Sequence, residues 1–129
     1  MYDCNIVIID DDRIILELIG IILEEMISGE IVSFSDSNEA LAYVKSDNIK
    51  GVSLVICDWL MPDVSGLDIL AALRQQHKDC AFLMVTANAT KKLVVDAMRL
   101  GASDFIVKPF VAADLLAKVE RLIHEVGFD

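Results

Sequence analysis

The chain has 129 residues, enough for one compact domain with its own hydrophobic core. Hydrophobic residues make up 55% of it and charged residues 25%, a composition that is typical of globular proteins and argues against a disordered chain. The formal net charge is −10, and residues 1–70 carry 14 acidic but only three basic residues. Such a surface repels nucleic-acid phosphates, so we expect no direct nucleic-acid binding, and the excess of acids points to a cation site.

The cysteines and the N-terminus narrow the setting of the protein. Each cysteine stands in or beside an apolar run, which predicts buried, reduced thiols at Cys4, Cys57 and Cys80. A zinc site is not expected, because the sequence has no CxxC pair and its two histidines lie far apart. No secretory signal opens the chain, and three glutamates interrupt its most apolar stretch, residues 14–27. We therefore expect a cytoplasmic protein with no membrane association.

Strand and helix patterns alternate along the chain. Short apolar runs predict strands at residues 6–9, 30–34, 52–57, 81–86 and 105–107. Segments of helical length follow them at residues 13–28, 36–46, 65–77, 90–100 and 112–126. Ser65 and Asp68 have the spacing of a capping box, and Gly101 and Gly127 stand where helices close. Five strands alternating with five helices predict an α/β fold, a parallel doubly wound sheet in a single domain.

Ligands of open α/β sheets bind at the carboxyl ends of the strands. In this sequence those ends carry Asp10-Asp11-Asp12, Asp58, Thr86 and Lys108-Pro109. Carboxylates that converge repel one another unless a cation neutralises them, and oxygen ligands suit Mg²⁺. A lysine and a hydroxyl beside the cation would complete a site for a phosphoryl group, and a carboxylate can itself be the nucleophile. Each residue alone also has a simpler explanation, as a helix cap, a strand former or a solvated charge.

Four segments of the sequence resemble the receiver domains of two-component response regulators. They are the acids after Ile9, the loop Asp58-Trp59-Leu60-Met61-Pro62 with Gly66, the run Met84-Val85-Thr86-Ala87, and residues 101–110. The resemblance covers nearly the whole chain in the right order, and it is greatest to single-domain, CheY-like chemotaxis regulators. A receiver cut from a longer protein would look the same. The resemblance implies the flavodoxin-like strand order 2-1-3-4-5.

The resemblance also implies a role for each site residue. Asp58 would be the phosphoacceptor, in a protein that is not a conventional enzyme but promotes its own phosphorylation and dephosphorylation. Mg²⁺, or Mn²⁺ in its place, would be bound by Asp11, Asp58 and the backbone carbonyl of Leu60, with Asp10 holding a metal-bound water. Lys108 would pair with the phosphoryl oxygens, and the Lys108–Pro109 peptide bond would be cis.

A switch and a set of partners follow from the same resemblance. Thr86 and Phe105 match the pair of residues that moves when the acceptor is phosphorylated. The output face would be formed by the helix at 90–100, the strand at 105–107 and the helix at 112–126. The expected partners are a sensor histidine kinase or a histidine phosphotransfer protein, and a downstream effector or attached output domain. A phosphorylation-dependent homodimer is left open.

Several positions depart from the usual pattern or are unusually apolar. Leu60 is aliphatic where many receivers have a polar residue near the attacking water, which predicts slow to intermediate dephosphorylation. Val111 stands where the last helix would normally have a polar cap. Helix 13–28 has more apolar residues than one stripe requires. Either this helix is more buried than most, or Ile14 and Leu18 contact the kinase.

Two other functional classes compete with the receiver. In a phosphohydrolase of the haloacid dehalogenase type, Asp10 and Asp12 would be the nucleophile and the acid, and Thr86 and Lys108 would match later motifs. No second acidic pair follows Lys108, and Asp58 would have no role. A degenerate interaction module that is never phosphorylated is disfavoured, because every position that the chemistry needs is occupied.

Overall fold

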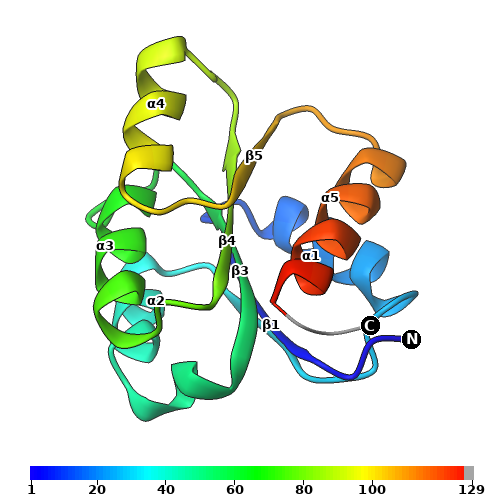
Figure 1. Ribbon diagram of the computed structural model, residues 1–129. Helices are drawn as coiled ribbons and strands as arrows, with labels where there is room; N and C mark the ends of the chain where they lie inside the picture. The colour runs from blue at the N-terminus through cyan, green and yellow to red at the C-terminus, as the bar shows by residue number, and fades with distance from the viewer. Residues whose placement is uncertain (127–129) are drawn as a thin grey trace.

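The computed structural model describes residues 1–126 and contains one sheet of five parallel strands, in the order β2-β1-β3-β4-β5. The strands are β1 (Asn5–Ile9), β2 (Ile31–Phe34), β3 (Val52–Asp58), β4 (Ala81–Thr86) and β5 (Asp104–Val107). The helices are α1 (Arg13–Glu24), α2 (Ser37–Val44), α3 (Gly66–Gln76), α4 (Lys91–Arg99) and α5 (Ala112–Glu125), with a short 3₁₀ helix, η1 (Asp47–Gly51). Helices α1 and α5 cover one face of the sheet and α2, α3 and α4 the other (Figure 1). The predicted fold class and strand order are confirmed.

The three central strands are apolar because both of their faces are covered by helices. Every residue of β3 and β4 is buried, as are the last four of β1, whereas β2 and β5 at the sheet edges are only partly buried. Two hydrophobic cores result, one between the sheet and α1 and α5, the other between the sheet and the three remaining helices. This rigid sheet fixes where the residues at its carboxyl edge lie.

Helix starts follow the sequence closely. Side-chain oxygens accept hydrogen bonds from the first turns of α1, α2, α3 and α4, at Asp12, Asp36, Ser65 and Thr90 respectively. Ser65 and Asp68 form the predicted capping box. Gly101 follows α4 with φ +105°, as expected of a residue that closes a helix. Helix α5 begins after Val111, whose side chain caps nothing.

The first helix is shorter than predicted, because it ends at Glu24 instead of continuing to residue 28. Residues 26–28 instead hydrogen-bond with Tyr2: the Tyr2 N–H donates to Met26 O, and the Ser28 N–H donates to Tyr2 O. The apolar pattern continues past Glu24 because Ile27 is buried in this pairing. Gly127, predicted to close α5, lies outside the described residues.

The cysteines agree with the sequence analysis, since Cys4, Cys57 and Cys80 are all buried and unpaired. Burial raises the pKa of the Cys80 thiol to about 12. Across residues 1–126, no helix has the length and apolar character needed to cross a membrane.

Candidate functional site

The site lies at the carboxyl edge of the sheet, where four strands end side by side. Asp10 and Asp11 follow β1, Asp58 is the last residue of β3, Thr86 is the last residue of β4, and Lys108 follows β5. The parallel order β1-β3-β4-β5 brings these ends together, although they are separated by up to 98 positions in sequence. In each of these strands the residues that lead up to the carboxyl end are apolar, namely Ile6–Ile9, Leu54–Cys57, Ala81–Val85 and Phe105–Val107, so the change to polar residues coincides with the strand end.

Three carboxylates converge there. Asp10, Asp11 and Asp58 each offer an oxygen, and these oxygens lie within 4.8 Å of one another. Asp10 and Asp58 are buried, with 1% and 8% of their surface exposed, whereas Asp11 is exposed. The Asp10 Oδ1 also accepts a hydrogen bond from the Asp12 N–H at 2.9 Å, which fixes the turn between β1 and α1.

Lys108 supplies a positive charge inside the cluster. Its Nζ lies 2.8 Å from Asp10 Oδ2 and 3.5 Å from Asp58 Oδ1. Burial alone would lower the pKa of Lys108, but the hydrogen bond that Lys108 donates to Asp10 and the charges of Asp10 and Asp58 outweigh burial, and the pKa is raised. Lys108 therefore stays protonated beside the Asp58 carboxylate. The Lys108–Pro109 peptide bond is cis in the structure.

One ammonium does not balance three carboxyl groups. Burial, and next the charge of Asp10, raise the pKa of Asp58 from its ordinary value of 3.8 to about 6, although Lys108 opposes the shift. The raised pKa means that Lys108 alone does not offset the burial of the Asp58 carboxylate and its repulsion by Asp10. A donor set made only of carboxylate oxygens, two of them from buried residues, is compatible with a hard divalent cation.

Thr86 and Phe105 lie on neighbouring strands and on the same face of the sheet. Met84 is paired with Phe105 and Thr86 with Val107, and alternate residues of a strand share a face. Thr86 is buried, and its Oγ1 accepts a hydrogen bond from the Asn88 N–H at 3.1 Å. Phe105 is half-buried, and the Nζ of Lys118 lies 5.5 Å from its ring centroid. The structure therefore brings the proposed switch pair together.

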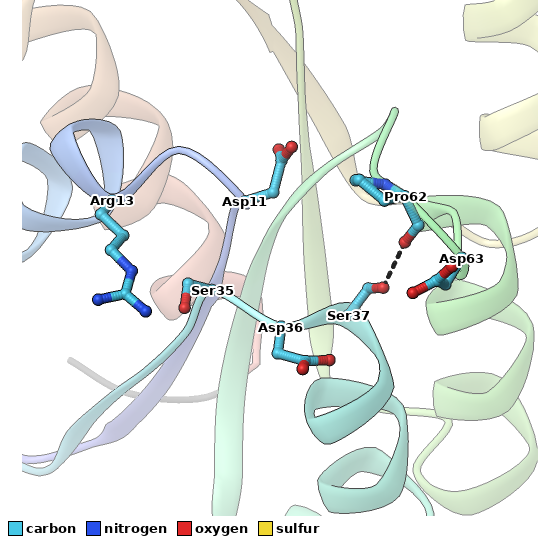
Figure 2. A pocket seen from close by; sticks show the side chains of 7 residues that line it. All are labelled: Asp11, Arg13, Ser35, Asp36, Ser37, Pro62 and Asp63. Atoms are coloured by element: carbon cyan, nitrogen blue, oxygen red, sulfur yellow. Dashed lines mark hydrogen bonds between the residues drawn. The ribbon is translucent and has the colours of Figure 1, made fainter.

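A pocket of about 370 Å³ opens beside the acidic cluster. Figure 2 shows the seven residues that line it, which are Asp11, Arg13, Ser35, Asp36, Ser37, Pro62 and Asp63. They come from the loops after β1, β2 and β3 and from the first residues of α1 and α2, and all but one of their charged side chains are acidic. Asp11 thus belongs both to the pocket wall and to the cluster of carboxylates.

The model of the response regulator receiver domain family matches residues 6–120. The chain belongs to this family. The receiver is 31% identical over 125 residues to the chemotaxis protein CheY of Pseudomonas aeruginosa, and the alignment covers 95% of this chain and 98% of that protein. The receiver is also 30% identical over 127 residues to the alkaline phosphatase synthesis transcriptional regulatory protein SphR of Synechococcus elongatus. That alignment covers 93% of this chain but only 49% of the longer protein.

The solved structures give the same result. The CheY-like response regulator receiver domain protein of Methanospirillum hungatei JF-1 superposes with a TM-score of 0.87 at 28% identity, covering 96% of each chain. The receiver described here therefore resembles both a single-domain protein of its own length and about half of a longer transcriptional regulator.

The family assignment disfavours the hydrolase alternative, and the role of Asp12 agrees with it. The Asp12 Oδ1 accepts a hydrogen bond from the Ile14 N–H at 2.9 Å, so this carboxylate caps α1. The simpler explanation is thus correct for Asp12.

The contribution of α2 to this region is not evident from the sequence. Ser37 is buried and donates a hydrogen bond to Pro62 O, in the loop that follows Asp58. A serine in a predicted first helical turn is usually a cap, so nothing in the sequence distinguished it.

Proposed function

We propose that this receiver accepts a phosphoryl group on Asp58 from the phosphohistidine of a sensor histidine kinase or a histidine phosphotransfer protein. The observation that supports this best is the position of Asp58: its Oδ1 lies 3.5 Å from Lys108 Nζ, within a cluster of carboxylates that needs a cation. A carboxylate in this setting is a nucleophile next to charges that can stabilise phosphoryl oxygens.

In the proposed reaction an Asp58 oxygen attacks phosphorus, and the bond between phosphorus and the imidazole nitrogen breaks. The electron pair of that bond returns to the imidazole, and the product on Asp58 is an acyl phosphate. With a pKa of about 6, Asp58 is mostly ionised at neutral pH and therefore nucleophilic. Lys108 pairs with the phosphoryl oxygens. Attack of water on phosphorus later releases phosphate and restores the carboxylate, and this is the receiver's own dephosphorylation.

The carboxylates of Asp11 and Asp58 and the backbone carbonyl of Leu60 would hold the divalent cation, with Asp10 reaching it through water. When bound, Mg²⁺ supplies positive charge that offsets the negative charge of the phosphoryl oxygens and of the three carboxylates. Asp10 also keeps Lys108 in place through their ion pair of 2.8 Å.

Phosphorylation would be read out through Thr86 and Phe105. The added charge attracts the Thr86 hydroxyl, and the vacated space lets the Phe105 ring turn inward. The output face would be formed by α4, β5 and α5, and it would contact a downstream effector or an attached output domain. That face carries five of the eleven lysine and arginine residues of the chain, namely Lys91, Lys92, Arg99, Lys118 and Arg121.

The first helix supplies a surface for the phosphodonor. Leu16, Ile19 and Leu23 face the core, whereas Ile14 is 77% exposed and Leu18 is 43% exposed. Ile15 and Ile22 pack partly against the core, so burial leaves only the exposed residues such as Ile14 and Leu18 unexplained. We propose that Ile14 and Leu18 contact the helical domain of the kinase near Asp58.

Trp59, the single tryptophan, allows a label-free test because it is buried directly after Asp58. Its fluorescence would be followed on addition of Mg²⁺ and then of beryllofluoride or acetyl phosphate. We expect a saturable, Mg²⁺-dependent change in the wild type that is lost in Asp58→Asn. The matched control is Asp12→Asn, which removes a neighbouring charge but keeps a side chain able to cap α1.

Each other result has a definite meaning. A wild type that responds to no phosphodonor would contradict the proposal and favour the inert module. A response that persists in Asp58→Asn but is lost in Asp10→Asn would favour the hydrolase.

A further inference from the structure

The loop of residues 59–65, which follows the proposed phosphoacceptor, is anchored firmly at its base. The Trp59 N–H donates to Val85 O on β4 at 3.0 Å, and the Gly66 N–H donates back to Trp59 O at 2.9 Å. A Cβ at residue 66 would lie 2.7 Å from Asp58 O and 2.9 Å from Trp59 Cα, so only glycine allows this approach. The two ends of the loop are thereby closed against β3.

The tip of the same loop has a strained conformation. Asp63 has φ +69°, and within residues 1–126 it is the one non-glycine residue with positive φ. The Val64 N–H donates to Pro62 O at 2.8 Å, so Asp63 is the central residue of a γ-turn with positive φ, a rare and strained turn. Such conformations persist only where the surroundings hold them.

The first turn of α2 provides that support. The Ser37 hydroxyl donates to Pro62 O at 2.6 Å, the bond drawn in Figure 2. It also accepts from the Val64 N–H at 3.3 Å, so it joins both arms of the turn. Ser37 is only 5% exposed, which protects these bonds from water. The adjacent Asn38 donates from Nδ2 to Asp63 Oδ2 at 3.2 Å.

We propose that Ser37 is a positioning residue that fixes the loop of residues 59–65 and thereby sets the affinity of the site for its divalent cation. This inference rests on the proposed function, in which Asp58 and the carbonyl of Leu60 are ligands. Leu60 lies between the anchored base of the loop and its supported tip, and its side chain is 70% exposed. The side chain therefore contributes little to fixing its own carbonyl. The position of the backbone at residue 60 depends on the anchored base of the loop and on the tip that Ser37 supports.

The pocket in Figure 2 shows why α2 can have this effect. Ser37 and Asp11 line the same pocket, Ser37 from the α2 side and Asp11 from the loop after β1. The hydroxyl of Ser37 holds the loop of residues 59–65 against α2. Asp11, across the same pocket, would bind the cation together with Asp58 and the carbonyl of Leu60. Loss of this hydroxyl would let residues 60–64 relax away from the acidic cluster.

The test compares the Mg²⁺ dissociation constants of Ser37→Ala and the wild type, read from Trp59 fluorescence without any phosphodonor. A net contribution of one or two hydrogen bonds corresponds to an increase in this constant of about three- to tenfold. With Mg²⁺ saturating, phosphorylation by acetyl phosphate should return to within about twofold of the wild-type rate, because Ser37 does not contact the reacting atoms. The matched control is Ser35→Ala, which removes a hydroxyl from the same pocket wall and should leave the constant unchanged.

A purely structural role would lower the midpoint of urea unfolding in EDTA without changing the Mg²⁺ dissociation constant, and that result would overturn the proposal. If Ser37→Ala does not fold, Asn38→Ala carries the test, with a smaller weakening of Mg²⁺ binding expected. An unchanged constant in whichever variant folds overturns the proposal. A wild type without any Mg²⁺-dependent Trp59 signal would instead contradict the proposed function itself, so the two failures are distinguishable.

Discussion

Replacing Asp58 by asparagine should stabilise the metal-free receiver. Burial and the charge of Asp10 raise the pKa of Asp58 from 3.8 to about 6 in the folded protein, so the folded state binds this proton more tightly than the unfolded state does. The stabilisation that comes from this tighter proton binding is fully present below about pH 4 and is lost as the pH rises through about 6. Each unit of pKa is worth about 1.4 kcal/mol, so ionised Asp58 costs up to about 3 kcal/mol at pH 7.5 and about half of that at pH 5.

Urea unfolding in EDTA at these two pH values would measure the effect. We expect Asp58→Asn to be more stable than the wild type by about 1–3 kcal/mol at pH 7.5, and by about half as much at pH 5. Addition of Mg²⁺ should stabilise the wild type and narrow the difference, because the cation binds the folded state. The reasoning would be refuted by an asparagine variant no more stable than the wild type at pH 7.5, or by an equal gain at both pH values.

Three further predictions concern single elements. Val111→Asp should give α5 the cap that it lacks and raise the free energy of unfolding by about 0.5–2 kcal/mol, and an unchanged urea midpoint would count against this. Leu60→Asn should shorten the lifetime of the acyl phosphate, because an amide can orient the attacking water and an exposed leucine cannot. Loss of radiolabelled phosphate would measure it, and a longer lifetime in the variant would sink the idea. Alanine at both Ile14 and Leu18 should slow phosphotransfer from the kinase but leave phosphorylation by acetyl phosphate unchanged. Equal kinase rates in both proteins would show that this surface is not used.

The fold was predictable because its determinants are local and repeated. Runs such as Leu54–Cys57 and Phe82–Val85 are apolar without alternation, which is typical of strands buried on both faces. The helix ends at Ser65 and Gly101 also depend on nearby residues, and both were found. The end of α1 was not, because it depends on pairing with Tyr2, which lies far away in sequence.

The site was predictable to a lesser extent. The sequence indicates which residues stand at strand ends, and parallel topology then places them at one edge. It does not indicate how charges pair there, and the contact of Lys108 with Asp10 at 2.8 Å appears only in three dimensions. The contacts of Arg74 likewise cannot be predicted from the sequence. Its guanidinium donates to the backbone carbonyls of Gly101, His77, Lys78 and Cys80, and so ties the end of α3 to the segment after α4.

The distribution of buried residues indicates where a charge change at Asp58 would have its largest effect. Helix α4 buries a single residue, Ala97, fewer than any other α-helix in the described part of the chain. Helix α5 buries four residues and is also tied to β5, since Asp104 pairs with Lys118 and Arg121. A free-energy change of a few kcal/mol at the carboxyl edge can shift an equilibrium only where the competing states differ by a similar amount. Thr86 ends the strand that leads into α4, so we expect phosphorylation to displace α4 and leave α5 essentially in place.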